Sequence, residues 1–329
     1  MAVLVTGGAG YIGSHMANEL IDAGEDVVVL DDMSAGFWWA VPPEAKLVQG
    51  DMGDQALVER TIREHGVDAI AHFAAKIVVP DSVADPLGYY LNNTVKARAL
   101  IESAVKSKVK HFIFSSTAAV YGEPATNPIP EDLPLAPINP YGRSKMMTEM
   151  ILRDVSAAHD LSHVILRYFN VSGADPKGRT GQSSPNATHL IKVAAQAALG
   201  RRPFMEVFGT DFPTPDGSGV RDYVQVTDLV RAHMAALKHL RAGGESLTCN
   251  CGYGSGYSVL QVIDVMKKVS GADFTVRMSG RRAGDPAALT AKADRIREKL
   301  GWTPEFDDLE TIVRQALKWE EKLARRNAR

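Results

Sequence analysis

The sequence predicts an α/β protein with a doubly wound parallel sheet, followed by a smaller mixed α/β part. In the first half, short apolar runs alternate with longer helical patterns. The apolar runs are rich in Val and Ile and are bounded by Gly, Asp or Ser, which is typical of buried parallel strands. Helices between such strands cover both faces of the sheet. We expect strands at 3–6, 27–30, 46–49, 69–73, 111–115 and 163–167, and helices at 12–23, 55–64, 86–106 and 140–158.

The pattern changes after Gly173, which suggests a boundary between two domains, 1–173 and 174–329. Glycine and proline become frequent in 173–185 and again in 208–219. Further helices are expected near 189–199 and 258–269, and an amphipathic helix from Leu309 to Leu323 follows them. A predicted strand at 221–226 is expected to rejoin the first sheet, so a return segment near 221–230 belongs with the first domain.

Composition excludes several classes of function. The chain has 329 residues, 45% of them hydrophobic, and a formal net charge of -2, so no general attraction to nucleic acid is expected. Two cysteines do not make a disulfide framework, and no metal site is expected. No apolar run is long enough to span a bilayer, and the N-terminus lacks the features of a signal peptide. We therefore expect a cytoplasmic protein that does not bind membranes.

A glycine-rich loop joins the first predicted strand to the first helix. Glycines at 7, 10 and 13 allow a sharp turn, a close approach of the backbone to a pyrophosphate, and tight packing of the helix. The helix N-terminus then presents free N–H groups to the phosphates. Asp31 ends the second strand, about twenty residues further on, where a carboxylate accepts from the ribose hydroxyls. Residues 32–37 include no Arg or Lys for a 2′-phosphate, so NAD is favoured over NADP.

Tyr141 and Lys145 form a candidate acid–base pair one turn apart on a helix. This spacing is common by chance, but here it follows a dinucleotide loop and a strand that ends in Ser115, Ser116 and Thr117. Lowering a phenol pKa to neutrality takes a shift of roughly three units, about 4 kcal/mol. A nearby ammonium and a cationic nicotinamide are the expected sources of this shift. Thr117 offers a hydroxyl that orients the reacting oxygen.

Along nearly its whole length the chain resembles the extended short-chain dehydrogenase/reductase family and, within it, the UDP-glucose 4-epimerases. Its Rossmann-like motifs are general to the superfamily, and the later motifs narrow the resemblance to sugar-nucleotide enzymes. The segments that carry it are 3–15, 72–75 (His-Phe-Ala-Ala), 89–93 (Tyr-Tyr-Leu-Asn-Asn), 112–117, 139–142 (Asn-Pro-Tyr-Gly), 166–170 (Leu-Arg-Tyr-Phe-Asn), 219–223 (Gly-Val-Arg-Asp-Tyr) and 281–286 (Arg-Arg-Ala-Gly-Asp-Pro).

The resemblance implies a role for each matching residue, with NAD bound by the first domain and a UDP-sugar by the second. Tyr141, Lys145 and Thr117 match the catalytic residues. Those matching the cofactor site are Gly7, Gly10, Tyr11, Ile12, Gly13, Asp31, Asp51, Met52, Phe73, Ala74, Ala75, Asn93, Ser115, Tyr141, Lys145 and Tyr168. Those matching the substrate site are Thr117, Tyr141, Asn170, His189, Leu190, Phe208, Arg221, Arg282 and Asp285. The family also implies a homodimer built on the 86–106 and 141–158 helices.

The implied reaction inverts the C4 hydroxyl of a UDP-hexose, UDP-glucose or UDP-galactose, through a 4-keto sugar that turns before it is reduced again. Leu289 stands where side-chain size governs acceptance of an N-acetyl group, so UDP-GlcNAc stays open, as do UDP-pentoses and UDP-uronates. A 4,6-dehydratase would carry Asp-Glu at 118–119, where this chain has Ala-Ala. A catalytically silent NAD-binding scaffold is a further alternative, although such relatives usually lose the tyrosine or the lysine.

Overall fold

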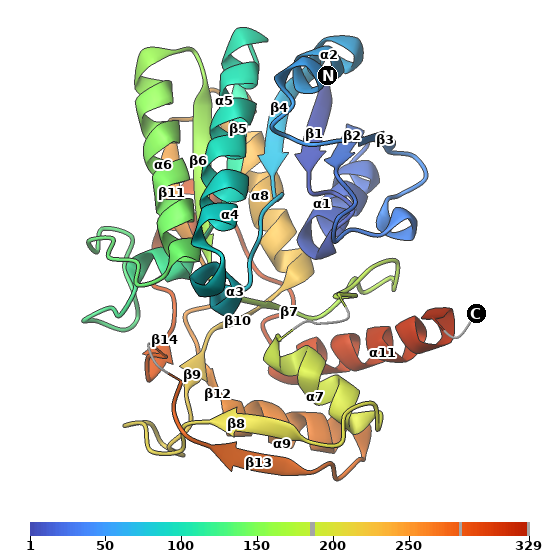
Figure 1. The fold of residues 1–329 in the computed structure, drawn as a ribbon, viewed down its shortest axis with the longest axis vertical. Coiled ribbons are helices and arrows are strands. Elements are labelled where there is room, and N and C mark those ends of the chain that lie inside the picture. Colours follow the sequence, from blue (N-terminus) through green and yellow to red (C-terminus); the bar gives the residue numbers. More distant parts are fainter. Residues whose placement is uncertain (185–187, 283–284, 328–329) are drawn as a thin grey trace.

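A sheet of seven parallel strands forms the centre of the molecule, in the order β11–β6–β5–β4–β1–β2–β3 (Figure 1). This computed structural model describes residues 1–184, 188–282 and 285–327. The predicted doubly wound sheet is confirmed, and all six predicted strands lie in it. The strands are β1 (Ala2–Thr6), β2 (Asp26–Asp31), β3 (Lys46–Gln49), β4 (Val67–His72), β5 (His111–Thr117), β6 (Ser162–Tyr168) and β11 (Leu247–Cys251).

Helices cover both faces of this sheet (Figure 1). Alternate residues of a strand point to opposite faces, so Val3 and Val5 of β1 join one apolar cluster while Leu4 joins another. On the first face, α1 packs against α8, and α8 also contacts β5 and β6. On the other face, α5 contacts both α2 and α6. These helices are α1 (Tyr11–Asp22), α2 (Gln55–His65), α5 (Lys96–Lys106), α6 (Pro140–Ala158) and α8 (Val226–Arg241).

The helix expected at 86–106 is divided into three pieces. It consists of α4 (Pro86–Tyr90), a π-helical turn η2 (Leu91–Val95) and α5, and it follows the short helix α3 (Val79–Ala84). Within the π turn the carbonyl of Asn93 accepts from Oγ1 of Thr148 on α6, at 3.0 Å. A π turn inserts an extra residue and is frequent at functional sites. Here it turns the Asn93 side chain into the protein, where it is almost fully buried.

The expectation that the 221–226 strand rejoins the first sheet is wrong. The place beside β6 is taken by β11, while β10 (Tyr223–Gln225) pairs with β7 (Asn170–Ser172) in a separate two-stranded sheet. The physical reason is the buried carboxylate of Asp222, which accepts from the backbone N–H groups of Tyr253, Gly254 and Ala291 at 2.9 to 3.1 Å. These bonds hold the segment beside the second half of the chain.

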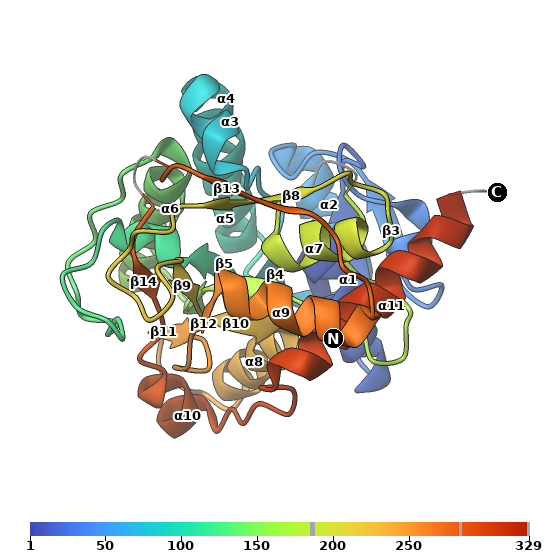
Figure 2. The same cartoon turned by 90° about the horizontal axis from the view of Figure 1, so that it is seen from below.

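The smaller part lies beyond the carboxyl ends of the strands (Figure 1), and Figure 2 shows its helices and strands from below. Its helices α7, α9 and α11 pack together, and a single apolar cluster runs from the sheet into them. No helix of the described residues is long and apolar enough to cross a membrane. The remaining elements are η1 (Trp38–Ala40), η3 (Ala118–Tyr121), α7 (Leu190–Ala198), β8 (Met205–Phe208), β9 (Val220–Arg221), β12 (Tyr257–Ser258), α9 (Val259–Ser270), β13 (Val276–Ser279), β14 (Ala288–Leu289), α10 (Asp294–Leu300) and α11 (Leu309–Asn327).

Both β11 and α8 come from beyond Gly173 and yet complete the sheet layer. The division into 1–173 and 174–329 therefore stays a prediction about domains, with α8 and β11 as the segments that cross back.

Candidate functional site

The predicted cofactor residues lie along one edge of the large sheet, at the carboxyl ends of β1, β2, β4, β5 and β6. The loop after β1 requires glycine for steric reasons. A Cβ on Gly7 would lie 2.7 Å from the nitrogen of Ala74, and one on Gly13 would lie 2.2 Å from the carbonyl oxygen of Gly7. Gly10 precedes α1 without a side-chain cap, so the N–H groups of Tyr11 and Ile12 begin the helix uncapped by any side chain. This geometry suits an anionic diphosphate.

Asp31 lies beside this loop and is buried. Its two carboxylate oxygens accept from the backbone N–H groups of Ala9 and Met33, at 2.9 and 2.8 Å. Burial raises the pKa of Asp31 above its usual value, and the two backbone bonds partly oppose that effect. The carboxylate is thus fixed next to the glycine loop, in the position where a ribose would bind.

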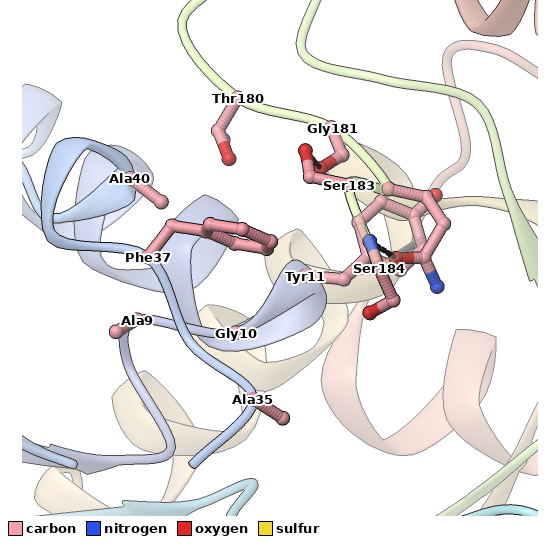
Figure 3. Close-up of a pocket in the computed structure, with 11 residues that line it drawn as sticks. Ala9, Gly10, Tyr11, Ala35, Phe37, Ala40, Thr180, Gly181, Ser183 and Ser184 are labelled. Atoms are coloured by element: carbon pink, nitrogen blue, oxygen red, sulfur yellow. Dashed lines mark hydrogen bonds between the residues drawn. The ribbon is translucent and has the colours of Figure 1, made fainter. Parts of the chain in front are cut away.

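Two segments, the turn that holds Phe37 and the Thr180–Ser184 segment, enclose the outer side of the glycine loop. Figure 3 shows Phe37 between the loop at Ala9 and Gly10 and the Thr180–Ser184 segment. Two hydrogen bonds join α1 to this later part of the chain. The Tyr11 hydroxyl donates to the Gly173 carbonyl at 2.7 Å, and Ser14 shares a hydrogen bond with Thr180 at the same distance. The Tyr11 side chain therefore holds the chain at Gly173 against α1.

The strand end of β5 brings the predicted catalytic residues together. Nζ of Lys145 donates to the carbonyl of Ser115 at 2.9 Å. Oγ1 of Thr117 accepts from the N–H of Ala119 at 3.1 Å, and the Thr117 side chain lies beside that of Tyr141. Tyr141 and Lys145 are both buried, on the face of α6 that packs on β5. The spacing of four thus places both side chains at one strand end.

The electrostatics of the pair differ from the expectation. Burial raises the pKa of Tyr141 to about 12, against the opposing hydrogen bond with Thr117. Burial also lowers the pKa of Lys145 to about 7, and the carboxylate of Glu149 opposes that shift. The protein's own groups therefore hold Tyr141 as a neutral phenol at neutral pH. The expected lowering needs a cation beyond Lys145, and the positive nicotinamide of NAD is such a group.

Residues after β3 and β4 line the same edge. Phe73 packs its ring against His233 of α8, with the centroids 4.8 Å apart. The side chain of Asn93 makes its hydrogen bonds within the protein. Its Oδ1 accepts from the N–H of Lys76, and its Nδ2 donates to the carbonyl of Lys76 and to Oγ of Ser144. It thus holds the segment that follows Ala74 and Ala75.

The remaining predicted cofactor residues are placed as follows. Asp51 caps the turn through the N–H of Gly53 at 2.8 Å, and Met52 is buried beside it. Tyr168 ends β6 near Ser115 and Tyr141, and burial raises the pKa of its phenol.

Two arginines lie at the predicted diphosphate position, on the smaller part. Arg221 forms an ion pair with Asp285. The guanidinium carbon of Arg282 lies 3.6 Å from the ring centroid of Phe208. Arg282 and Asp285 line a cleft of about 630 Å³, together with Glu123, Pro124, Phe212, Pro213, Arg281, Pro286 and Ala287. Two of the residues in the predicted Arg281–Pro286 motif, 283 and 284, lie outside the described part of the chain.

The other predicted substrate residues are spread over neighbouring elements. Asn170 begins β7 with an exposed side chain, and its N–H donates to the carbonyl of Asp222. His189 and Leu190 start α7, where the His189 ring contacts the amide of Gln182 at 3.3 Å.

His233 escaped the sequence reasoning. Its Nε2 lies 2.8 Å from Oγ of Ser115, and its Nδ1 lies 2.9 Å from the carbonyl of Leu229. The two bonded residues, 115 and 233, are 118 positions apart, so no local pattern could have linked them. The histidine fixes the Ser115 side chain from the opposite face of the sheet.

A doubly wound sheet with a glycine loop, a buried acid at the end of the second strand and a buried tyrosine–lysine pair defines an NAD-dependent enzyme of the short-chain dehydrogenase type. The chain belongs to the NAD dependent epimerase/dehydratase family, which matches residues 3–252. The resemblance noted in the sequence is confirmed.

Relatives narrow the class further. The chain is 57% identical to a UDP-glucose 4-epimerase of Azospirillum brasilense, over 98% of this chain and 92% of the relative. It is similar to a crystal structure of UDP-glucose 4-epimerase from Brucella ovis in complex with NAD, with 44% identity and a TM-score of 0.94 over 96% and 97% of the two chains. The UDP-Glc/GlcNAc 4-epimerase of Campylobacter jejuni is 47% identical, with a TM-score of 0.86 over 98% and 99%.

Proposed function

We propose that this protein interconverts UDP-glucose and UDP-galactose by inverting the C4 hydroxyl, with NAD as a regenerated cofactor. The observation that carries the proposal is the buried Tyr141–Thr117 contact with Lys145 beside it, on the sheet edge that also bears the glycine loop. The full-length similarity to UDP-glucose 4-epimerases supports the same reaction.

The glycine loop and Asp31 are assigned to NAD, the diphosphate at the α1 N-terminus and a ribose at the Asp31 carboxylate. When bound, NAD accepts the hydride from C4 and returns it. The nearby Ser115, Tyr168 and Phe73 are assigned to the nicotinamide side of the site, and Asp51 and Met52 to the adenine side.

Tyr141 is assigned the proton transfer. Its phenolate oxygen takes the proton of the sugar O4 and the resulting phenol later gives it back, while Thr117 orients that oxygen and Lys145 supplies positive charge. Because burial disfavours the tyrosinate, the anion forms only when positive charge is next to it. Without that positive charge, Tyr141 therefore stays a neutral phenol in the protein interior.

The UDP portion is assigned to the cleft on the smaller part. The guanidiniums of Arg221 and Arg282 are suited to bind a diphosphate through forked hydrogen bonds. Asp285 is assigned to the uridine ribose, Asn170 to the diphosphate side of the sugar nucleotide, and Phe208, with His189 and Leu190, to the rest of the binding surface. Binding that is concentrated on UDP leaves the 4-keto sugar free to turn between the two hydride transfers.

Leu289 is the residue assigned to sugar selection. It is half-buried in β14, in register with Arg221 of β9. Its intermediate size makes UDP-GlcNAc the second candidate substrate, and the similarity to a UDP-Glc/GlcNAc 4-epimerase favours testing it first. UDP-pentoses and UDP-uronates follow as further candidates.

A homodimer is proposed from a row of exposed apolar side chains. Leu87, Leu91 and Val95 follow one another at intervals of four along α4 and the π turn, and Leu87 is 80% exposed. Met147 and Met150 on the adjacent α6 extend this row. A contiguous apolar surface of this kind marks a protein contact. A second copy is the proposed occupant, and the cytoplasm, where the free buried thiols stay reduced, is the proposed location.

Light scattering coupled to gel filtration tests the dimer. Leu91→Glu places a charge in the row and is expected to give a monomer. Met278→Glu, at a residue of β13 that is 58% exposed and far from the row, serves as the control and is expected to stay dimeric. A monomeric wild-type protein would contradict the proposal.

Proton NMR of the sugar tests the reaction itself. Purified protein is incubated with UDP-galactose, with and without added NAD and with no reductant. Appearance of UDP-glucose at one fixed ratio from either direction is expected. Binding of NAD without conversion of any UDP-sugar would instead identify a catalytically silent scaffold.

A further inference from the structure

The buried carboxylate of Glu149 lies one helical turn beyond Lys145, on the same face of α6. Positions 141, 145 and 149 are four residues apart, so their side chains form one row. All three residues are buried, and the helix runs beside β5 and β6 (Figure 1). Neither the glycine loop nor the UDP cleft contacts Glu149, so binding of cofactor and nucleotide leaves its presence unexplained.

This row matches three consecutive residues at the end of β5. Lys145 donates to the carbonyl of Ser115, and Oγ of Ser116 donates to Oε1 of Glu149. Thr117, the next residue, lies beside Tyr141. The helix is therefore bonded to the strand end at two successive positions, 115 and 116, and Glu149 makes the second of these bonds.

Glu149 is also a buried charge with fixed partners. Arg167 of β6 donates to both of its oxygens, at 2.7 Å from Nη2 and 3.0 Å from Nε, and Nη2 of Arg153 donates at 2.9 Å. The side chains of Glu149 and Arg167 are 0% and 3% exposed. The buried carboxyl group is thus held by direct hydrogen bonds from two guanidiniums, the kind of partner that a buried ionic group requires.

We propose that Glu149 is a positioning residue of the proton-transfer site, which holds the end of β5 in register with α6 and supplies the negative charge that keeps Lys145 protonated beside Tyr141. The proposal rests on the proposed function.

The other groups around Lys145 do not supply this charge. His72 on β4 and His233 on α8 are held neutral, since burial lowers their pKa values to about 3 and about 4. Tyr141 on α6 is a neutral phenol, and the ring of Phe114 on β5 lies 4.9 Å from Nζ of Lys145. Arg167 on β6 is positive and would oppose the ammonium if Glu149 did not neutralise it.

The sign of the expected pH effect follows from burial. Burial lowers the pKa of Lys145 to about 7, and Glu149 acts against this shift. Removing the carboxylate should therefore lower that pKa further, so that the ammonium is lost at a lower pH. As the pH is raised, kcat should then decline at a lower pH in the variant than in wild type. The alkaline limb of the kcat–pH profile should therefore shift toward acid.

The test is the pH profile of kcat in the holoenzyme of Glu149→Gln, which keeps the size of the side chain and removes its charge. We expect kcat at alkaline pH to fall roughly ten-fold, as loss of one pKa unit in the lysine gives, with the KM for UDP-galactose within about two-fold. Asp154→Asn, an exposed residue of the same helix, makes the same charge change and is expected to leave the profile unmoved.

An unmoved alkaline limb in a folded Glu149→Gln protein would overturn the charge role. Ser116→Ala, which cuts only the bond to the strand, tests the register role and should lower kcat without shifting the limb; an unchanged kcat would overturn it. If Glu149→Gln does not fold, Glu149→Gln combined with Arg167→Gln removes both partners. Because the positive charge of Arg167 is lost as well, this variant is expected to show a smaller shift toward acid, and an unmoved limb in it would overturn the charge role. If wild type converts no UDP-sugar, the proposed function is refuted. If wild type is active and the variants do not behave as expected, only the role proposed for Glu149 is refuted.

Discussion

The substitution Tyr141→Phe removes one oxygen and distinguishes the effect of this residue on catalysis from its effect on folding. Tyr141 is buried, and its side chain lies beside that of Thr117. Burial raises the pKa of the phenol to about 12, so the residue is uncharged at neutral pH and the substitution removes no buried charge. The cost to folding is at most one neutral hydrogen bond, about 1 kcal/mol. The cost to catalysis is the acid–base group, and we expect kcat to fall roughly 10² to 10⁴-fold.

The assay follows conversion of UDP-galactose by proton NMR, with thermal unfolding and UDP titration on the same protein. UDP affinity should stay within about two-fold of wild type, because Arg221 and Arg282, which are proposed to bind the diphosphate, lie on the smaller part. Tyr90→Phe, at a half-buried tyrosine of α4, is the matched control. Turnover of Tyr141→Phe within ten-fold of wild type, which is a smaller loss than expected, would refute the assignment of the proton transfer.

Further predictions concern the cofactor loop, the lysine and the UDP cleft. Gly13→Ala should abolish stabilisation by NAD in thermal unfolding, because its Cβ would lie 2.2 Å from the Gly7 loop carbonyl, whereas Gly280→Ala, with open space around it, should bind NAD normally. Since burial lowers the pKa of Lys145 to about 7, the unfolded chain binds this proton more tightly; the stability of wild type relative to Lys145→Met should therefore rise from about pH 7 to pH 9 in denaturant titrations. Arg282→Ala should raise the KM for UDP-galactose roughly ten-fold with kcat little changed, while Arg277→Ala, which removes a similar stack on a phenylalanine, should not. An equal KM in both arginine variants would contradict the placement of UDP.

The accuracy of the sequence reasoning varied with the distance between interacting residues. The glycine loop, Asp31 and the Tyr141–Lys145 spacing are local patterns, each set by one turn or one helix face, and the structure places them at one sheet edge. The 221–226 strand was misplaced because its partner depends on the buried carboxylate of Asp222, whose contacts lie 31 to 69 residues away.

The same distinction holds for electrostatics. Sequence reasoning suggested that Lys145 and a cationic nicotinamide together lower the pKa of Tyr141; within the protein alone, burial is the larger effect and raises it to about 12. How deeply a side chain is buried depends on the whole packing around it, so the sequence could not decide the sign.

By itself the sequence determined the parallel sheet, the preference for NAD and the residues of the acid–base pair, because each follows from short-range periodicity or from a motif that one strand, turn and helix complete. Only the tertiary structure decided which distant groups support that pair. The bond from His233 to Ser115 joins a helix and a strand 118 residues apart, and the bond from Arg167 to Glu149 joins a strand to the helix that precedes it. A contact of that kind depends on how the elements pack, and no residue in the sequence marks its partner in advance.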